Sequence, residues 1–218
     1  MSKTKSAAFF DVDETLINMK SMFDFLQFWY QEKNEKEKLN SYMFNFKNEV
    51  KNGTKREKLN REYYRQFKGV DYLDLVESGE KWFSSILDKN LFIGEAIEAL
   101  KRHQIQNDDI VFVSGSMFPI LSPIANYLGV KEILCAPIEL SHDGIVTGEI
   151  GVPQTIGKGK KEAILHYCNE RNIDPKKCYA YGDDLSDIPM MEVTGHPICV
   201  GRNSNLSNHA LLHGWIII

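Results

Sequence analysis

The chain has 218 residues, of which 43% are hydrophobic and 26% are charged, as in an ordinary soluble globular protein. Its formal net charge of -4 argues against a general nucleic-acid-binding protein. No apolar stretch is long enough for a transmembrane helix, and the apolar run near the N-terminus is too short for a signal peptide. The length suits one sizeable α/β domain, or a core domain with a small insertion.

The four cysteines, at positions 135, 168, 178 and 199, form no CxxC pair. None of them lies with histidines at the spacing of a zinc site. We therefore expect reduced, mostly buried thiols in a cytoplasmic protein.

Residues 7–10 form the first predicted strand, and Asp11 and Asp13 follow it directly. Residues i and i+2 of a strand point to the same side, so these carboxylates are expected side by side. Two adjacent carboxylates at the end of a buried strand repel each other and are costly to desolvate. The pair makes sense if a cation lies between the carboxylates, or if one is a nucleophile and the other a proton donor.

Residues 19–90 have a different character, with helical periodicity, few β-branched residues and dense charge. They predict a small helical bundle whose apolar faces lie within residues 22–30, 42–50, 59–67 and 73–87. Asn52 and Gly53 are a C-cap signal for the second of these helices. This segment reads as an all-helical domain inserted after the first strand.

After residue 90 the predicted helices and strands alternate, which is typical of a parallel sheet with helices on both faces. Strands are expected at 110–113, within 132–140, and at 178–181, 198–200 and 215–218, with a β-hairpin around 144–148. Helices are expected at 96–103, 118–128, 160–172 and 205–213. The predicted fold class is α/β, with a Rossmann-like core of residues 1–18 and 91–218 and the helical insertion of residues 19–90.

Ligands of open parallel sheets bind beyond the carboxyl ends of the strands. The conspicuous polar residues fall at three such ends, which carry Asp11 and Asp13, then Ser114, then Asp183, Asp184 and Asp187. We expect these three strand ends to converge on one polar site.

Asp11 is a candidate nucleophile, because a carboxylate that attacks phosphorus divides one hard hydrolysis into two easier steps. Asp13 would protonate the leaving alkoxide and later deprotonate the attacking water, which requires an environment that raises its pKa. Mg²⁺ prefers oxygen ligands, so Asp11, Asp183 and the backbone carbonyl of Asp13 could hold it. Asp187 could hold a metal water or orient a lysine, and Asp184 is a weaker candidate.

The Ser114 hydroxyl and the Gly115 amide lie where a strand gives way to a helix, and such donors suit a phosphate. Lys158 or Lys160, near the start of the helix predicted at 160–172, could balance the charge of a phosphoryl group in transit. Each motif alone has an ordinary alternative as a turn, a cap or a solvated loop. Their joint occurrence in this order favours a catalytic site.

The motifs resemble those of the haloacid dehalogenase superfamily of phosphatases. They are Asp11-Val12-Asp13-Glu14-Thr15-Leu16, Ile110-Val111-Phe112-Val113-Ser114-Gly115-Ser116, the lysine of Gly157-Lys158-Gly159-Lys160, and Tyr181-Gly182-Asp183-Asp184-Leu185-Ser186-Asp187. A helical C1 cap after the first motif is similar to the phosphoserine-phosphatase-like subfamily IB. The resemblance implies a Rossmann-like core, Mg²⁺, and hydrolysis of a small-molecule phosphomonoester through Asp11.

For the third motif we prefer Lys160, because the apolar residues at +3, +4 and +7 from it form one buried helical stripe, whereas Lys158 would precede the helix. Phosphoserine phosphatases carry a glutamate nine residues after the nucleophile that binds the substrate ammonium. Lys20 occupies that position here, so phosphoserine is not the expected substrate. Lys20, with Arg61 or Arg65, would instead favour a second anionic or polar group on the substrate.

The predicted cap holds 14 of the chain's 24 Phe, Trp and Tyr residues. We interpret these mainly as the core of the bundle, while a site for an apolar or aromatic phosphate ester is compatible with that. Two other functions remain open, namely a phosphotransferase that uses the same intermediate and a non-catalytic binding protein on the same fold. A non-catalytic binding protein has no need for Asp13, so the presence of this residue weighs against that function. It also weighs against dehalogenase or phosphonatase chemistry, because the residue is typical of ester hydrolysis in this superfamily.

Overall fold

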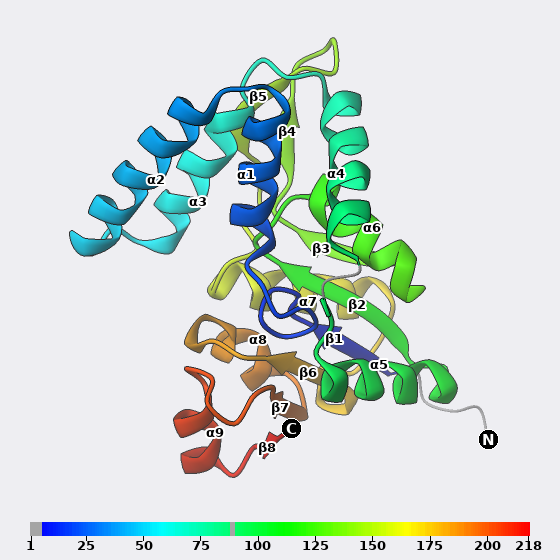
Figure 1. Ribbon diagram of the computed structural model, residues 1–218. Helices are drawn as coiled ribbons and strands as arrows, with labels where there is room; N and C mark the ends of the chain where they lie inside the picture. The colour runs from blue at the N-terminus through cyan, green and yellow to red at the C-terminus, as the bar shows by residue number, and fades with distance from the viewer. Residues whose placement is uncertain (1–5, 88–89) are drawn as a thin grey trace.

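The computed structural model of the chain describes residues 6–87 and 90–218 (Figure 1). Its core is a six-stranded parallel sheet with the strand order β3-β2-β1-β6-β7-β8. The strands are β1 (Ala7–Phe10), β2 (Asp109–Ser114), β3 (Glu132–Cys135), β6 (Tyr179–Gly182), β7 (His196–Cys199) and β8 (Ile216–Ile217). This sheet confirms the predicted α/β fold class.

Strand β1 lies inside the sheet because its four residues are all apolar and can be buried on both faces. Phe10 belongs to the hydrophobic core on one side of the sheet and Phe9 to the core on the other, as strand alternation requires. Phe10 also pairs with Phe112 of β2 and with Tyr181 of β6. The carboxyl ends of β1, β2 and β6 therefore lie at nearly the same height in the sheet, and the residues that follow them lie at one edge of it.

Helices cover both faces of the sheet. They are α5 (Gly94–Gln106) and α6 (Phe118–Leu128) on one face, with α7 (Lys158–Glu170), α8 (Ile188–Val193) and α9 (Ser207–His213) on the other. The prediction that Lys158 precedes the helix is wrong, because α7 begins at that residue. The sequence does not indicate α8, since six residues are too few to show helical periodicity.

The segment 132–140 forms two strands in two sheets rather than one strand. Strand β4 (Ile138–Leu140) leaves the core sheet after Pro137 and pairs antiparallel with β5 (Val146–Ile150), which confirms the predicted hairpin. The hairpin extends away from the core sheet toward the helices near the N-terminus (Figure 1). The backbone N–H of Gly69 donates to the carbonyl of Val146 at 2.8 Å, so the hairpin is fastened to that helical part of the chain.

The four predicted helices after β1 are present, as α1 (Ser21–Glu32), α2 (Lys36–Lys51), α3 (Arg56–Tyr64) and α4 (Tyr72–Ile86), with a 3-10 turn, η1 (Arg65–Phe67), after α3. Helix α2 ends at Lys51 with Asn52 as its C-cap, and Gly53 follows with a φ of +74°, as the C-cap signal predicts. The helices stand together on one side of the sheet (Figure 1). The assignment of residues 19–90 to a separate cap domain, with a core of 1–18 and 91–218, stays a prediction.

All four cysteines are free, and three of them are buried while Cys135 is half-buried. In the described parts of the chain, no helix combines the length and the apolar character needed to cross a membrane.

Gly79 is the point where α4 packs most closely on the core helix α6. A Cβ atom added there would lie 1.9 Å from the carbonyl oxygen of Pro119. Alanine inside a helix is ordinarily about 1 kcal/mol more favourable than glycine. Here we expect the opposite, with Gly79→Ala destabilising the protein by about 1–3 kcal/mol because the two helices must separate.

Urea unfolding measures this effect, and Gly94→Ala is the matched control. Gly94 also lies in a helix, but an added Cβ meets no atom within 4 Å. We expect this control to be neutral or stabilising by up to about 1 kcal/mol. Equal stabilities of the two variants would contradict the close contact between α4 and α6.

Candidate active site

The turn after β1 presents the first group of acidic residues. The backbone N–H of Asp11 donates to the carbonyl of Tyr181 at 2.9 Å, which extends the pairing of β1 with β6 by one residue. The carbonyl of Val12 then accepts from the N–H groups of Leu16 and Ile17 at 2.9 and 3.1 Å. Glu14 takes a φ of +59°, in the left-handed region that non-glycine residues seldom adopt. This tight turn keeps Asp11, Asp13 and Glu14 on the wall of one cavity.

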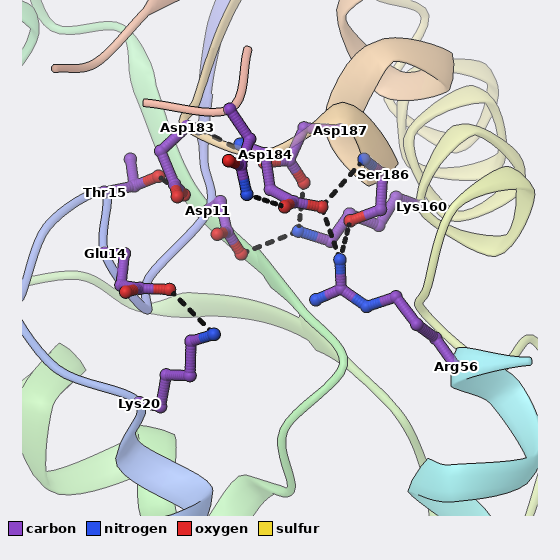
Figure 2. Close-up of polar contacts among 11 residues, drawn as sticks. Asp11, Glu14, Thr15, Lys20, Arg56, Lys160, Asp183, Asp184, Ser186 and Asp187 are labelled. Carbon is purple, nitrogen blue, oxygen red and sulfur yellow. Dashed lines mark hydrogen bonds and ion pairs between the residues drawn. The ribbon is translucent and has the colours of Figure 1, made fainter. Parts of the chain in front are cut away.

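Lys160 lies between two buried carboxylates (Figure 2). Its Nζ donates to Oδ1 of Asp11 at 2.6 Å and to Oδ1 of Asp187 at 2.7 Å. Asp187 uses its other oxygen, Oδ2, to accept from the backbone N–H groups of Asp183 and Asp184 at 3.3 and 3.2 Å. Two roles were predicted for Asp187, and its contacts match the one in which it orients a lysine. That lysine is Lys160, since Lys158 is exposed.

Three carboxylates gather at this end of the sheet, with oxygens of Asp11, Asp183 and Asp187 all within 4.8 Å of one another. Burial, and after it the nearby Asp187, raises the pKa of Asp183 to about 7, although Thr15 Oγ1 donates to its Oδ1 at 2.8 Å. Burial also raises the pKa of Asp11 well above its ordinary value, and Lys160 opposes this only in part. The positive charge of Lys160 alone therefore does not offset the burial and mutual repulsion of these carboxylates.

A divalent cation would supply further positive charge, and clustered carboxylate oxygens are the ligands that Mg²⁺ prefers. Both oxygens of Asp187 already have partners in Lys160 and two backbone amides. The side chains that fit the ion are therefore Asp11 and Asp183. The backbone carbonyl of Asp13 stays a predicted ligand.

Asp13 has the environment of a proton donor. Its Oδ1 is inaccessible to solvent and has no hydrogen-bond partner among the described residues. Burial raises the pKa of Asp13 to about 6. A carboxyl group with this pKa can both give and take a proton near neutral pH.

Ser114, the last residue of β2, and Gly115, which follows it, line the same cavity. The Oγ of buried Ser114 accepts from the N–H of Ser116 at 3.1 Å. A Cβ added at Gly115 would lie 2.6 Å from Cγ1 of Ile156, so the close approach of that loop requires glycine. Asn60 of α3 donates from Nδ2 to the carbonyl of Gly115 at 3.0 Å, which joins the helical bundle to the site.

The cavity that these residues enclose measures about 430 Å³. Its walls include most of the predicted site residues, namely Asp11, Asp13, Lys20, Ser114, Gly115, Lys160 and Asp183. Lys20 forms an ion pair with Glu14 at 3.3 Å (Figure 2).

The structure does not bring Arg61 to this cavity. Arg61 is exposed on α3, because that helix turns Leu59, Asn60, Tyr63 and Tyr64 inward. Arg65 pairs with Glu62 and Glu149 instead. The hypothesis that either arginine acts together with Lys20 is therefore not supported.

Arg56 is the cation that sequence reasoning missed. It is the first residue of α3, and its Nη1 donates to the Asp184 carboxylate and, at 3.0 Å, to Oγ of Ser186 (Figure 2). Burial opposes ionisation of Asp184, but the Ser186 amide and then Arg56 lower its pKa to about 2. The Gly53 turn indicates that Arg56 begins the next helix, but no sequence pattern shows that this end of the helix meets the acidic strand ends.

Comparisons with known proteins agree with this geometry. The pattern of the haloacid dehalogenase-like hydrolase family matches residues 8–192. A "probable phosphatase" of Mycobacterium tuberculosis (strain ATCC 25618 / H37Rv) is 27% identical over 220 residues, which cover 99% of this chain and 76% of that protein.

Two solved structures share the fold. A protein of unknown function from Bordetella pertussis Tohama I gives a TM-score of 0.87 at 21% identity and covers 99% of both chains. A phospho-aspartyl intermediate analogue of phosphoserine phosphatase gives a TM-score of 0.66 at 21% identity, over 99% of this chain and 93% of the other. The family pattern spans most of the sequence, and the chain therefore belongs to the haloacid dehalogenase-like hydrolases, with a fold like that of phosphoserine phosphatase.

Proposed function

We propose that this protein is a Mg²⁺-dependent phosphatase that hydrolyses a small-molecule phosphomonoester through an aspartyl-phosphate at Asp11. The observation that carries the proposal is the buried group in which Lys160 joins Asp11 to Asp187 beside Asp183. The "probable phosphatase" named above supports the reaction class, and the likeness to phosphoserine phosphatase supports the fold in which it would occur.

In the first half-reaction a carboxylate oxygen of Asp11 forms a bond to phosphorus, and the bond from phosphorus to the ester oxygen breaks. Asp13 gives its proton to the departing oxygen, so the leaving group departs as an alcohol. In the second half-reaction Asp13 takes a proton from water, the water oxygen bonds to phosphorus, and the Asp11 carboxylate leaves. The reaction returns both aspartates to their starting states.

Positive charge and hydrogen-bond donors stabilise the phosphoryl group during both steps. Lys160, held by Asp187, keeps its charge beside Asp11, while the Ser114 hydroxyl and the Gly115 N–H would bind phosphoryl oxygens. When bound by Asp11 and Asp183, Mg²⁺ would supply further positive charge to those oxygens. Residues 19–90 would act as a cap that closes over the site and excludes water.

Lys20 is the reason to exclude phosphoserine as the main substrate. It lies on the cavity wall in the neighbourhood of Asp13 and Glu14. A cation there would repel the amino group of phosphoserine. We therefore expect esters without an ammonium group to react faster.

Release of inorganic phosphate from a panel of phosphomonoesters, measured with Mg²⁺ and with EDTA, tests the proposal. We expect release with Mg²⁺, at least about 100-fold less with EDTA because clustered carboxylates then face the phosphate unneutralised, and a low rank for phosphoserine. The same protein after Mg²⁺ is restored is the control. Absence of release from every ester by a folded, Mg²⁺-binding protein would contradict the phosphatase assignment.

A further inference from the structure

The cavity above Asp11 has walls of two kinds. Its inner end carries the acidic residues and Lys160. Beside the polar residues Lys20, Thr54, Arg56 and Asn60, the side of the helical bundle presents five apolar residues, Met22, Phe23, Phe46, Val50 and Leu59, with a sixth, Ile156, opposite. We refer to these six residues as the apolar wall.

Packing of the helical bundle accounts for the apolar wall only in part, since Met22, Phe23 and Phe46 contact the core but stay partly exposed. The bundle has an aromatic core in which Phe25, Trp29, Phe67 and Trp82 contact one another, and each of them is at most 4% exposed. The rings of Phe23 and Phe46 form a further edge-to-face pair, with centroids 4.9 Å apart, and contacts through Tyr42 and Tyr63 connect this pair to Phe67. Both rings of this pair are only half-buried, and they face the cavity.

The wall continues outward from the inner end of the cavity. Val50, near the end of α2, is 49% exposed, so apolar surface extends from the buried site toward solvent. The cationic side chains that the bundle brings to the cavity already have partners, since Lys20 pairs with Glu14 and Arg56 with Asp184. A polar leaving group lying along Phe23, Phe46 and Leu59 would lose water against these three apolar side chains, which offer it no hydrogen bond in return.

Building on the proposed function, we propose that the alcohol portion of the substrate is an alkyl or aryl group that lies along the apolar wall, while its phosphate reaches Asp11. A volume of about 430 Å³ suits a small molecule of this kind. Apolar contacts would provide most of the affinity, and the polar inner end would fix the position of the phosphate.

The affinity of non-hydrolysable n-alkylphosphonates, from ethyl to octyl, tests this inference without requiring turnover. Isothermal titration calorimetry with Mg²⁺ present gives the Kd, and each compound is used below the concentration at which it aggregates. We expect each added methylene to tighten binding about two- to fourfold until the wall is covered. The heat capacity change of binding should become more negative along the series.

Two phenylalanines on α2 provide a matched pair of variants. Phe46→Ser removes a ring from the wall and should flatten the dependence on chain length, while Phe44→Ser removes a ring that is 67% exposed outside the cavity and should preserve it. If Phe46→Ser does not fold, Val50→Ser tests the same wall. The Phe44→Ser protein also reports any general effect of losing an aromatic ring from this helix.

Affinity that stays level or falls with chain length would overturn the inference, as would failure of every phosphonate to bind. If affinity changed with chain length equally in Phe46→Ser, or Val50→Ser, and in Phe44→Ser, the alkyl chain would not lie along this wall. Hydrolysis of ethyl phosphate is the separate readout of the proposed function. A phosphatase that hydrolyses this ester but shows no dependence on chain length would retain the proposed function and lose only the apolar substrate.

Discussion

Asp11→Asn is expected to lower kcat for phosphate release by at least about 10⁴-fold, since the variant lacks the attacking carboxylate. The fold should survive, because the asparagine side chain can still accept a hydrogen bond from Lys160. Burial raises the pKa of Asp11, which means that the native protein disfavours its charged form. A neutral side chain of the same shape should therefore leave the melting temperature equal or higher.

The measurements are phosphate release with Mg²⁺ and thermal unfolding of the same preparation. Asp143→Asn is the control, because that carboxylate is almost fully exposed, lies outside the cavity and should tolerate the same chemical change. Near wild-type turnover by folded Asp11→Asn would refute the role of Asp11 as nucleophile.

Lys160→Met should impair both stability and activity. The substitution keeps a similar length but leaves Asp11 and Asp187 buried without their shared cation. Removing one partner of a buried ion pair typically costs about 3–5 kcal/mol, and part of this cost can be avoided if one carboxyl takes up a proton. We also expect kcat to fall by about 10²–10³-fold, because positive charge beside the transferred phosphoryl group is lost.

Lys158→Met separates this effect from a general loss of lysine on α7. Lys158 is exposed and is the first residue of the same helix. We expect its substitution to change the free energy of unfolding by less than about 0.5 kcal/mol and to leave kcat unchanged. If both variants gave the same urea midpoint and the same kcat, the buried position of Lys160 would have no energetic consequence and its assigned role would be wrong.

The parts of the site that follow strands could be predicted from the sequence. A short apolar run that ends at Asp11 has few alternatives to a buried strand, and parallel strands bring their carboxyl ends to one edge of the sheet. Once β1, β2 and β6 were recognised, Asp11, Ser114 and Asp183 had to converge. Lys160 followed from helical phase, since the apolar residues after it place it on the buried side of α7.

The contribution of the helical bundle could not be predicted in the same way. The spacing of Arg61 and Arg65 predicts that both lie on one face of a helix, but it does not say which face meets the site. Tertiary packing turns Leu59 and Asn60 inward and leaves Arg61 exposed, while Arg56 reaches the core from the start of the helix. Such contacts depend on how the bundle docks, which is a property of residues distant in sequence.

The sequence pattern also could not predict which apolar side chains of the bundle form its core and which line the cavity. Phe23 and Phe25 lie two residues apart on α1 and point about 200° apart around the helix axis, but helical phase alone does not say which direction meets the core. Only the packing of α2 shows that Phe25 joins the aromatic core while Phe23 meets Phe46 at the cavity. Hydrophobicity is the same for the two rings, so composition cannot tell the roles apart.

Mass spectrometry of protein quenched in acid during steady-state turnover is the most direct test of an aspartyl-phosphate at Asp11. The tryptic peptide of residues 6–20 contains this aspartate. In the wild-type protein with Mg²⁺ we predict the added mass of one phosphoryl group on Asp11 of that peptide, and no such addition in Asp11→Asn. A phosphoryl group on a different residue, with phosphate release retained by Asp11→Asn, would contradict the proposed mechanism.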